Sequence, residues 1–318
     1  MRSCLWLAVT ALLLGHSSVL AQTDAGQYPN QTVRIIVPFS AGSTTDGQAR
    51  AIADKLSDFW KQQVIVENRP GIAGTASVAR STADGYTLML TSNGHTIASV
   101  INKNLPYDPV KDFVGITQVS TVPVGFVVPP DLSAKTIKDF IALAKDKPGT
   151  LNFASAGRAS SSYLAAEVFK QTAKIDITHI PHKGAPEALT SILRGESQLF
   201  TTSVSQALDL HATKKVAILA VTRKVAALPD VPTVAEAGLP EYVYDSWFGV
   251  LAPAGTPRAI VNKVSQDIAR ALQLPDVHER MTRQGVVIIT QTPEQFDEII
   301  RRDTERFTRM LTEAGVGG

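Results

Sequence analysis

The stretch that decides the fold is VRIIVPFSAGSTTDG, which occupies residues 33–47. Its first five residues, Val33–Val37, form a short and nearly continuous apolar run, which is typical of a buried strand. From Ala49 to Trp60 apolar residues recur at helical spacing, which predicts a helix. The segment between them is built mainly from small and hydroxyl-bearing residues. We therefore expect a strand, a tight turn and a helix in succession, the repeating unit of α/β proteins.

The alternation of strand and helix continues along the chain. Apolar runs predict further strands at 64–66, 86–90, 125–130, 151–154, 177–181, 198–201, 216–221 and 248–252. Helical spacing predicts further helices at 75–80, 137–144, 163–172, 186–193, 258–272 and 293–314. This alternation indicates a parallel sheet with helices on its faces. The pattern restarts after an extended middle segment, and a length of 318 residues fits two α/β lobes of similar size.

The first 21 residues have the composition of a cleavable secretory signal. Arg2 supplies a basic start, Leu5–Leu14 is an apolar run of ten residues, and residues 19–21 read as a cleavage site before Gln22. A spanning helix needs roughly 20 apolar residues, so this run is too short to cross a membrane. We expect export to the periplasm, with an uncleaved anchor as the alternative.

Composition excludes several classes of protein. The chain is 44% hydrophobic and has 31 Lys and Arg against 29 Asp and Glu, a formal charge of +2. It is too hydrophobic for a disordered protein, and it lacks the basic excess of a nucleic-acid-binding protein. The one cysteine, Cys4, lies within the signal. A mature chain without Cys4 has no thiol for catalysis, metal binding or a disulfide.

The loop after the first strand has the features of an anion site. Ser43 is placed to cap the following helix, and Asp46, three residues on, is placed to complete a capping box. A helix N-terminus carries roughly half a positive charge and several unpaired N–H groups, so it binds anions readily. An ordinary capped helix is the alternative interpretation. The candidate ligand-binding residues of this loop are Phe39, Ser40, Ala41, Gly42, Ser43 and Asp46.

A second loop of the same build lies at 155–162, between a predicted strand and a predicted helix. It offers four hydroxyls, flexible amides and the guanidinium of Arg158. Ligands of open α/β sheets bind at the carboxyl ends of the strands, so two facing helix N-termini would hold a small anion. Arg158 either clamps a carboxylate or points to solvent. The candidates of this loop are Ser155, Gly157, Arg158, Ala159, Ser160 and Ser161.

Further along the chain, His182 and Lys183 follow a predicted strand and are candidates to line the ligand site. Ser203, after the strand predicted at 198–201, is another. His179 and His182 are three residues apart, but they lie in a strand and turn without a flanking carboxylate, so we expect no metal site. The sequence has no H-E-x-x-H, P-loop or G-x-S-x-G motif. We therefore expect no cofactor and no catalytic residue.

A series of short segments occurs in order along the chain. They are Tyr28–Pro29, Val33–Phe39, Val66–Gly71, Asp84–Leu88, Leu105–Pro109, Lys111–Phe113, Lys183–Gly184, Ala220–Thr222, Leu228–Thr233, Glu236–Gly238, Trp247–Gly249 and Ala252–Pro257. Together they resemble the Bug family of periplasmic solute receptors, which serve tripartite tricarboxylate transporters. The resemblance covers essentially the whole chain after the signal.

The resemblance implies a type II periplasmic binding fold, in which two α/β lobes joined by crossing strands close on a ligand. Lobe 1 then comprises residues 22–122 and 250–318, and lobe 2 comprises residues 123–249. It also implies that the two loops hold a small organic anion, a mono- or dicarboxylate, through amides, hydroxyls and ordered water. The expected partners are the membrane permease subunits of such a transporter and, as a further possibility, a sensor kinase. We expect a monomer.

The loops depart from the family's usual pattern, which leaves the identity of the ligand open. Ser40 replaces a proline and Ser43 a glycine in the first loop, whereas the aspartate is kept as Asp46. In the second loop Ala159 stands at a glycine and Tyr163 at a histidine. Three alternatives remain: a periplasmic enzyme that acts on a small carboxylate or ester, a receptor for phosphate, sulfonate or molybdate, and a sensor whose output is signalling.

Overall fold

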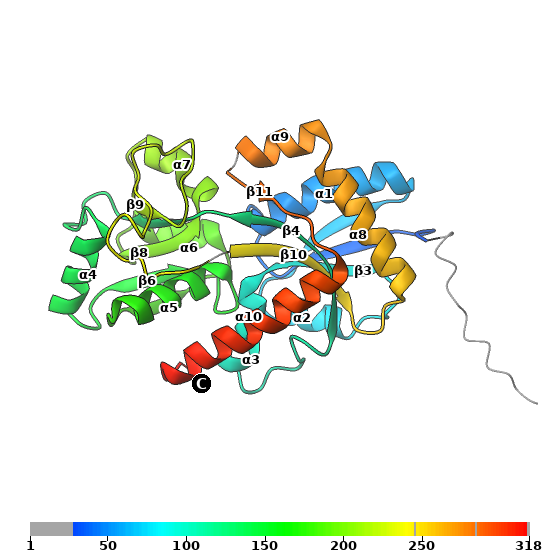
Figure 1. The fold of residues 1–318 in the computed structure, drawn as a ribbon, viewed down its shortest axis with the longest axis horizontal. Coiled ribbons are helices and arrows are strands. Elements are labelled where there is room, and N and C mark those ends of the chain that lie inside the picture. The colour runs from blue at the N-terminus through cyan, green and yellow to red at the C-terminus, as the bar shows by residue number, and fades with distance from the viewer. Residues whose placement is uncertain (1–27, 245, 284, 317–318) are drawn as a thin grey trace, which may run out of the picture.

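The structure, a computed structural model, describes residues 28–244, 246–283 and 285–316. The predicted signal, residues 1–21, lies outside the described residues. Figure 1 shows two sheets lying side by side, each with helices packed against it. The sheets have six and five strands.

The six-stranded sheet has the order β11-β4-β10-β3-β1-β2. Its strands are β1 (Val33–Val37), β2 (Val64–Asn68), β3 (Thr87–Ser92), β4 (Phe113–Val122), β10 (Ser246–Pro253) and β11 (Val287–Ile288). β1 is parallel to β2 and β3, whereas β10 is antiparallel to both β3 and β4. The prediction of a parallel sheet is wrong here, because β10 enters the sheet on its return from the other half of the molecule.

The five-stranded sheet has the order β7-β6-β8-β5-β9. Its strands are β5 (Val124–Val128), β6 (Asn152–Ser155), β7 (Thr178–Pro181), β8 (Leu199–Ser203) and β9 (Ala217–Val221). This sheet is mixed as well, because β6 is parallel to β7 and β8 while β5 is antiparallel to β8 and β9.

The helices pack against the sheets and close their hydrophobic cores. They are α1 (Thr44–Trp60), α2 (Ile72–Ala79), η1 (Asn93–Ile97, a 3₁₀ helix), α3 (Ala98–Ile101), α4 (Ile137–Asp146), α5 (Ser161–Ala173), α6 (Ala185–Leu193), α7 (Val204–Ala212), α8 (Arg258–Leu272), α9 (Pro275–Arg283) and α10 (Pro293–Glu313). Every helix predicted from the sequence is present, and η1, α3, α7 and α9 are additional. Within the described ranges no helix is both long and apolar enough to span a bilayer.

The chain passes between the two sheets at Pro123, which separates β4 from β5. It comes back after β9 and enters the six-stranded sheet as β10. The lobe boundary expected at 122/123 falls at the first of these crossings. The boundary expected at 249/250 falls inside β10, which pairs along its whole length with β4.

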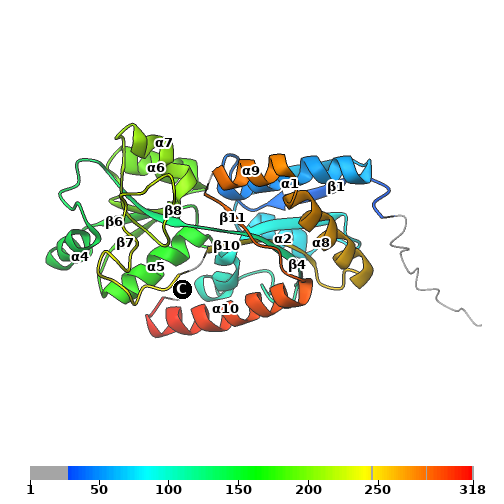
Figure 2. The ribbon, with the colours of Figure 1, turned by 45° about the horizontal axis from the view of Figure 1, so that its top comes forward.

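The last helix, α10, packs on both halves of the molecule. Phe296, near its start, is fully buried in a cluster with Trp247 of the six-stranded sheet. Phe307 and Leu311, near its end, belong to the core of the five-stranded half together with Tyr244. Figure 2 shows α10 running beneath both sheets. The end of the chain therefore helps to set how the two halves sit against each other.

Candidate functional site

The two loops singled out in the sequence come together between the sheets. The Ser161 N–H, at the start of α5, donates to Ser92 Oγ at the end of β3 with a distance of 3.2 Å. Gly94 packs directly on the backbone of Ala159 and Ser160, leaving no space for a side chain. The loop before α5 is thus held against the strand ends of the six-stranded sheet.

A small polar chamber lies where these elements meet. Its volume is about 30 Å³. It is lined by Phe39, Ser43, Thr44, Thr45, Ser92, Ala156, Ser160, Ser161, Ser162, Ala185, Thr202, Ser203 and Phe248. None of these described lining residues carries a charge, and nine of them carry a hydroxyl group.

Four helix N-termini point at the polar chamber. Its lining includes the first residues of α1, α5 and α6 and the residue that precedes α7. The N–H groups of Thr44, Thr45 and Ser162 have no hydrogen-bond acceptor among the described residues, as is usual in the first turn of a helix. Open amides and converging helix dipoles favour an anion at this point without any positively charged side chain.

Most polar groups of the first loop fold the loop itself. Ser43 is the N-cap of α1, as predicted, and its Oγ accepts the Asp46 N–H at 3.2 Å. The expected capping box does not form, because the Ser43 N–H donates to the Ser40 carbonyl. The buried carboxylate of Asp46 instead accepts from Gly42 N–H at 3.0 Å, and it also pairs with Arg50. These contacts fix the turn from which α1 begins.

Three hydrogen bonds set the electrostatics of Asp46. Burial alone would raise its pKa, but hydrogen bonds from Arg50, Gly42 and Asn68 outweigh burial and hold the pKa below its ordinary value. The carboxylate is therefore ionised at neutral pH. Because Arg50 lies 2.9 Å away, the charge of Asp46 is paired within the protein.

His179 supports the second loop, residues 155–162, through a hydrogen bond with Ser155. Ser155 Oγ lies 2.7 Å from His179 Nε2 and accepts the Gly157 N–H at 3.1 Å. Burial is the main reason that the pKa of His179 falls to about 3, and Arg158 adds to the effect. The ring is thus neutral at physiological pH. Ser160 caps α5 through the Tyr163 N–H and also contacts Ser162 Oγ at 2.8 Å.

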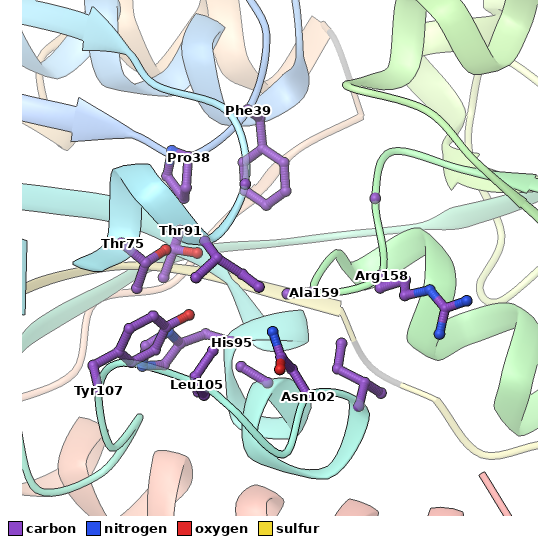
Figure 3. A pocket seen from close by; sticks show the side chains of 15 residues that line it. Pro38, Phe39, Thr75, Thr91, His95, Asn102, Leu105, Tyr107, Arg158 and Ala159 are labelled. Carbon is purple, nitrogen blue, oxygen red and sulfur yellow. The ribbon is translucent and has the colours of Figure 1, made fainter. Parts of the chain in front are cut away.

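An apolar chamber of about 290 Å³ lies beside the polar one. It is lined by Pro38, Phe39, Gly71, Ile72, Thr75, Thr91, His95, Ala98, Ile101, Asn102, Leu105, Tyr107, Gly157, Arg158 and Ala159. Figure 3 shows Pro38 and Phe39 on one side of it and His95, Leu105 and Tyr107 on the other. Ile72 and Arg158 are exposed, so they mark its opening to solvent.

The structure places the predicted site residues in four groups. Phe39, Ser43, Ser160, Ser161 and Ser203 line the polar chamber, whereas Gly157, Arg158 and Ala159 line the apolar chamber with Phe39. Ser40 and Gly42 contact the start of α6 instead, at Gly184 and Pro186. The remaining candidates line neither chamber: they are Ala41, Asp46, Ser155, His182 and Lys183.

Arg158 is exposed, and its guanidinium has no hydrogen-bond or ion-pair partner among the described residues. In Figure 3 this guanidinium points away from His95 and Tyr107. The two readings of Arg158 left open by the sequence were a carboxylate clamp and a solvent-facing side chain. The orientation seen here matches the second, and the side chain lines the chamber only at its mouth.

Sequence reasoning missed residues of both chambers. Ser92, Thr202 and Phe248 come from strand ends that carry no loop motif, and the far wall of the apolar chamber comes from residues 95–107. No site residue was expected in that segment, although Leu105–Pro109 is among the segments that resemble the Bug family. The signal that could have found it is the apolar spacing of Ala98, Ile101 and Leu105. Among the residues that the structure describes, no group of three or more His, Cys, Asp or Glu side chains is placed to hold a metal ion.

With this geometry in place, the chain can be compared with known proteins. Residues 48–316 match the family described as tripartite tricarboxylate transporter family receptor, TctC. This chain belongs to that family. The receptor has the fold of periplasmic binding proteins: it superposes on the periplasmic binding protein BugD with a TM-score of 0.84 and 29% identity, covering 91% of this chain and 99% of BugD.

Two ligand-bound structures are similarly close. Rhodopseudomonas palustris Rpa4515, solved with adipate, is 29% identical and gives a TM-score of 0.85, with 91% of this chain and 99% of that chain covered. MatC from the same organism, solved with malate, is 29% identical with a TM-score of 0.84, covering 89% of this chain and all of MatC (100%). Because its family consists of transporter receptors, this protein is a solute-binding protein and not an enzyme.

Proposed function

We propose that this receptor captures a small organic anion, a mono- or dicarboxylate, in the polar chamber and delivers it to the permease subunits of a tripartite tricarboxylate transporter. The observation that carries the proposal is the convergence of four helix N-termini on one chamber with open amides. The adipate and malate found in two relatives support a carboxylate as the anion.

In this proposal the two lobes close on the ligand, and the closed lobes are what the permease detects. The polar chamber takes Ser43–Thr45 and Ser92 from one side and Ser160–Ser162 and Ser203 from the other. A ligand that contacts both sides stabilises the closed arrangement of the lobes. The stabilisation equals the difference between the free energies with which the ligand binds the closed and the open arrangements. The permease then recognises the closed shape. In this proposal lobe 1 comprises residues 22–122 and 250–318, and lobe 2 comprises residues 123–249. The receptor works in the periplasm.

A thermal-shift and calorimetry panel tests this proposal. The protein is mixed with acetate, phenylacetate, adipate, malate, phosphate and methanesulfonate. A ligand present at a hundred times its dissociation constant stabilises the folded state by about 2.7 kcal/mol, so a true ligand raises the melting temperature by several degrees. Stabilisation by at least one carboxylate, recovered unchanged afterwards, supports the proposal. Binding of phosphate or sulfonate alone, or consumption of the ligand, contradicts it.

A further inference from the structure

The two chambers are neighbours that share a wall. Phe39 lines both of them. Consecutive residues at the end of β3 line one each, with Thr91 in the apolar chamber and Ser92 in the polar chamber. In the loop before α5, Ala159 lines the apolar chamber and Ser160 lines the polar chamber. The two chambers are therefore adjacent, and a molecule lying across their boundary would place a charged end in one and an uncharged body in the other.

The sizes of the chambers suit the two ends of such a molecule. The polar chamber measures about 30 Å³, and a water-sized group needs roughly 10–15 Å³. It thus has room for about two such groups, which matches the two oxygens of one carboxylate. The apolar chamber measures about 290 Å³, and a cavity of about 150 Å³ is enough to hold benzene. It has room for a six-membered ring with a short linker or a substituent.

The inner part of the far wall of the apolar chamber offers no positive charge to a second carboxylate. Of the lining residues, Arg158 carries a guanidinium, but it lies at the mouth and points away from this wall, and Asn102 offers only a neutral amide. Tyr107 is buried and its hydroxyl is hydrogen-bonded to Thr75. His95 is buried, with Nε2 2.8 Å from the Pro109 carbonyl oxygen, and burial lowers its pKa to about 4. Both side chains are therefore neutral at pH 7. A carboxylate placed against this wall would lose its hydration without gaining an ionic partner, which is costly.

We propose that the apolar chamber receives the uncharged body of the ligand, so that this receptor selects a monocarboxylate with a ring-sized apolar body over an aliphatic dicarboxylate. The inference rests on the proposed function, because it takes the polar chamber as the carboxylate site. It names a ligand class different from the adipate and malate bound by the two R. palustris relatives.

Calorimetry on the full chain separates the contributions of the two chambers. Phenylacetate offers both a carboxylate and a ring, acetate offers only the carboxylate, benzyl alcohol only the ring, and adipate a second charge. We expect phenylacetate to bind at least about tenfold more tightly than each of the other three. Adipate binding as tightly as phenylacetate overturns the inference and leaves the proposed function intact. Failure of every carboxylate to bind overturns both.

A charge placed on the wall gives a second and independent test. Ile72 lines the apolar chamber and is 37% exposed, so Ile72→Lys can be made without burying a new charge. The added ammonium supplies a cation for a second carboxylate, in addition to Arg158 at the mouth of the chamber. We expect the preference for phenylacetate over adipate to fall by at least about fivefold.

The matched control is Leu193→Lys, at a residue that is 46% exposed at the end of α6 and lines neither chamber. It adds the same charge to the protein at a remote site. We expect it to leave the preference unchanged. An equal change of preference in both variants, or in neither, contradicts the placement of the ligand body in the apolar chamber.

Discussion

Ser40, in the loop after β1, lies directly against Gly184, in the loop after β7. A methyl group on Gly184 would overlap the Ser40 side chain, and no backbone torsion at Gly184 requires glycine, because its φ is 179°. The two loops belong to different sheets. The contact between Ser40 and Gly184 therefore limits how closely the two halves can approach each other beside the polar chamber.

Gly184→Ala is expected to weaken binding of the best carboxylate of the panel by about tenfold, because overpacking of a tight contact costs about 1–3 kcal/mol. Isothermal calorimetry measures this loss. The double variant with Ser40→Gly removes the overlapping atoms and should regain most of the affinity, as a double-mutant cycle would show. A double variant as weak as Gly184→Ala alone would mean that the two residues do not interact through this contact.

Gly157→Val is expected to weaken carboxylate binding. Gly157 has a φ of +110°, which side-chain-bearing residues rarely adopt, and its N–H is bonded to Ser155 Oγ. A valine would shift the loop that lines both chambers. Gly195→Val is the matched control: its φ is also positive, at +70°, but it lies in an open turn after α6. Titration calorimetry should show a loss of affinity in the first variant only, and an equal loss in both would argue against a role for this loop.

Asp46→Asn is expected to lower the free energy of unfolding at pH 7 by about 1–3 kcal/mol, because the carboxylate is buried and accepts several hydrogen bonds. The folded state lowers the pKa of Asp46, so its stabilisation is complete above the ordinary value of about 3.9 and is lost as pH falls through the lower folded value. Urea unfolding at pH 7 and pH 3 should therefore show a smaller difference from wild type at pH 3. Asp54→Asn, at an exposed site of the same helix, should change little at either pH.

His95 is expected to make the protein less stable in mild acid. Its pKa is about 4 in the folded state, against about 6.5 for an unfolded chain, so the unfolded state binds the extra proton between these values. Stability conferred by the neutral ring is present above pH 6.5 and falls by about 1.4 kcal/mol for each pH unit below it.

The check is the slope of unfolding free energy between pH 6.5 and pH 5 in urea titrations. His95→Gln should reduce the slope by about one proton, whatever its effect on stability at pH 7. Identical slopes in wild type and His95→Gln would show that His95 titrates normally.

The sequence predicted the elements better than their directions. The apolar run Val33–Val37 and the helical spacing of Arg258–Leu272 predicted elements with the observed bounds. This works because the buried positions of a strand or helix are apolar, and their spacing follows the period of the element. The antiparallel entry of β10 was missed, because strand direction depends on where the chain returns from. Capping by Ser43 is local and was predicted correctly, whereas the bond from Gly42 to the Asp46 carboxylate depends on the turn geometry.

The candidate site was predictable only in part for a similar reason. Loops rich in Ser and Gly pointed to the polar chamber, because small residues expose backbone amides. The apolar chamber is assembled from the β1 loop, the start of α2, the end of β3, η1, α3, the segment after α3 and the loop before α5. Most of its members look like ordinary core residues when each is considered alone. His182 and Lys183 follow a strand end as expected, yet they line neither chamber, because α6 begins immediately behind them.

The packing of α10 bears on how the chain is made. Residues near the C-terminus complete both hydrophobic cores, with Phe296 in one half and Phe307 and Leu311 in the other. Neither core is finished until the last helix has been synthesised. A chain that stops short of α10 therefore leaves apolar surface uncovered in both halves, so neither half can fold to completion independently of the C-terminal segment.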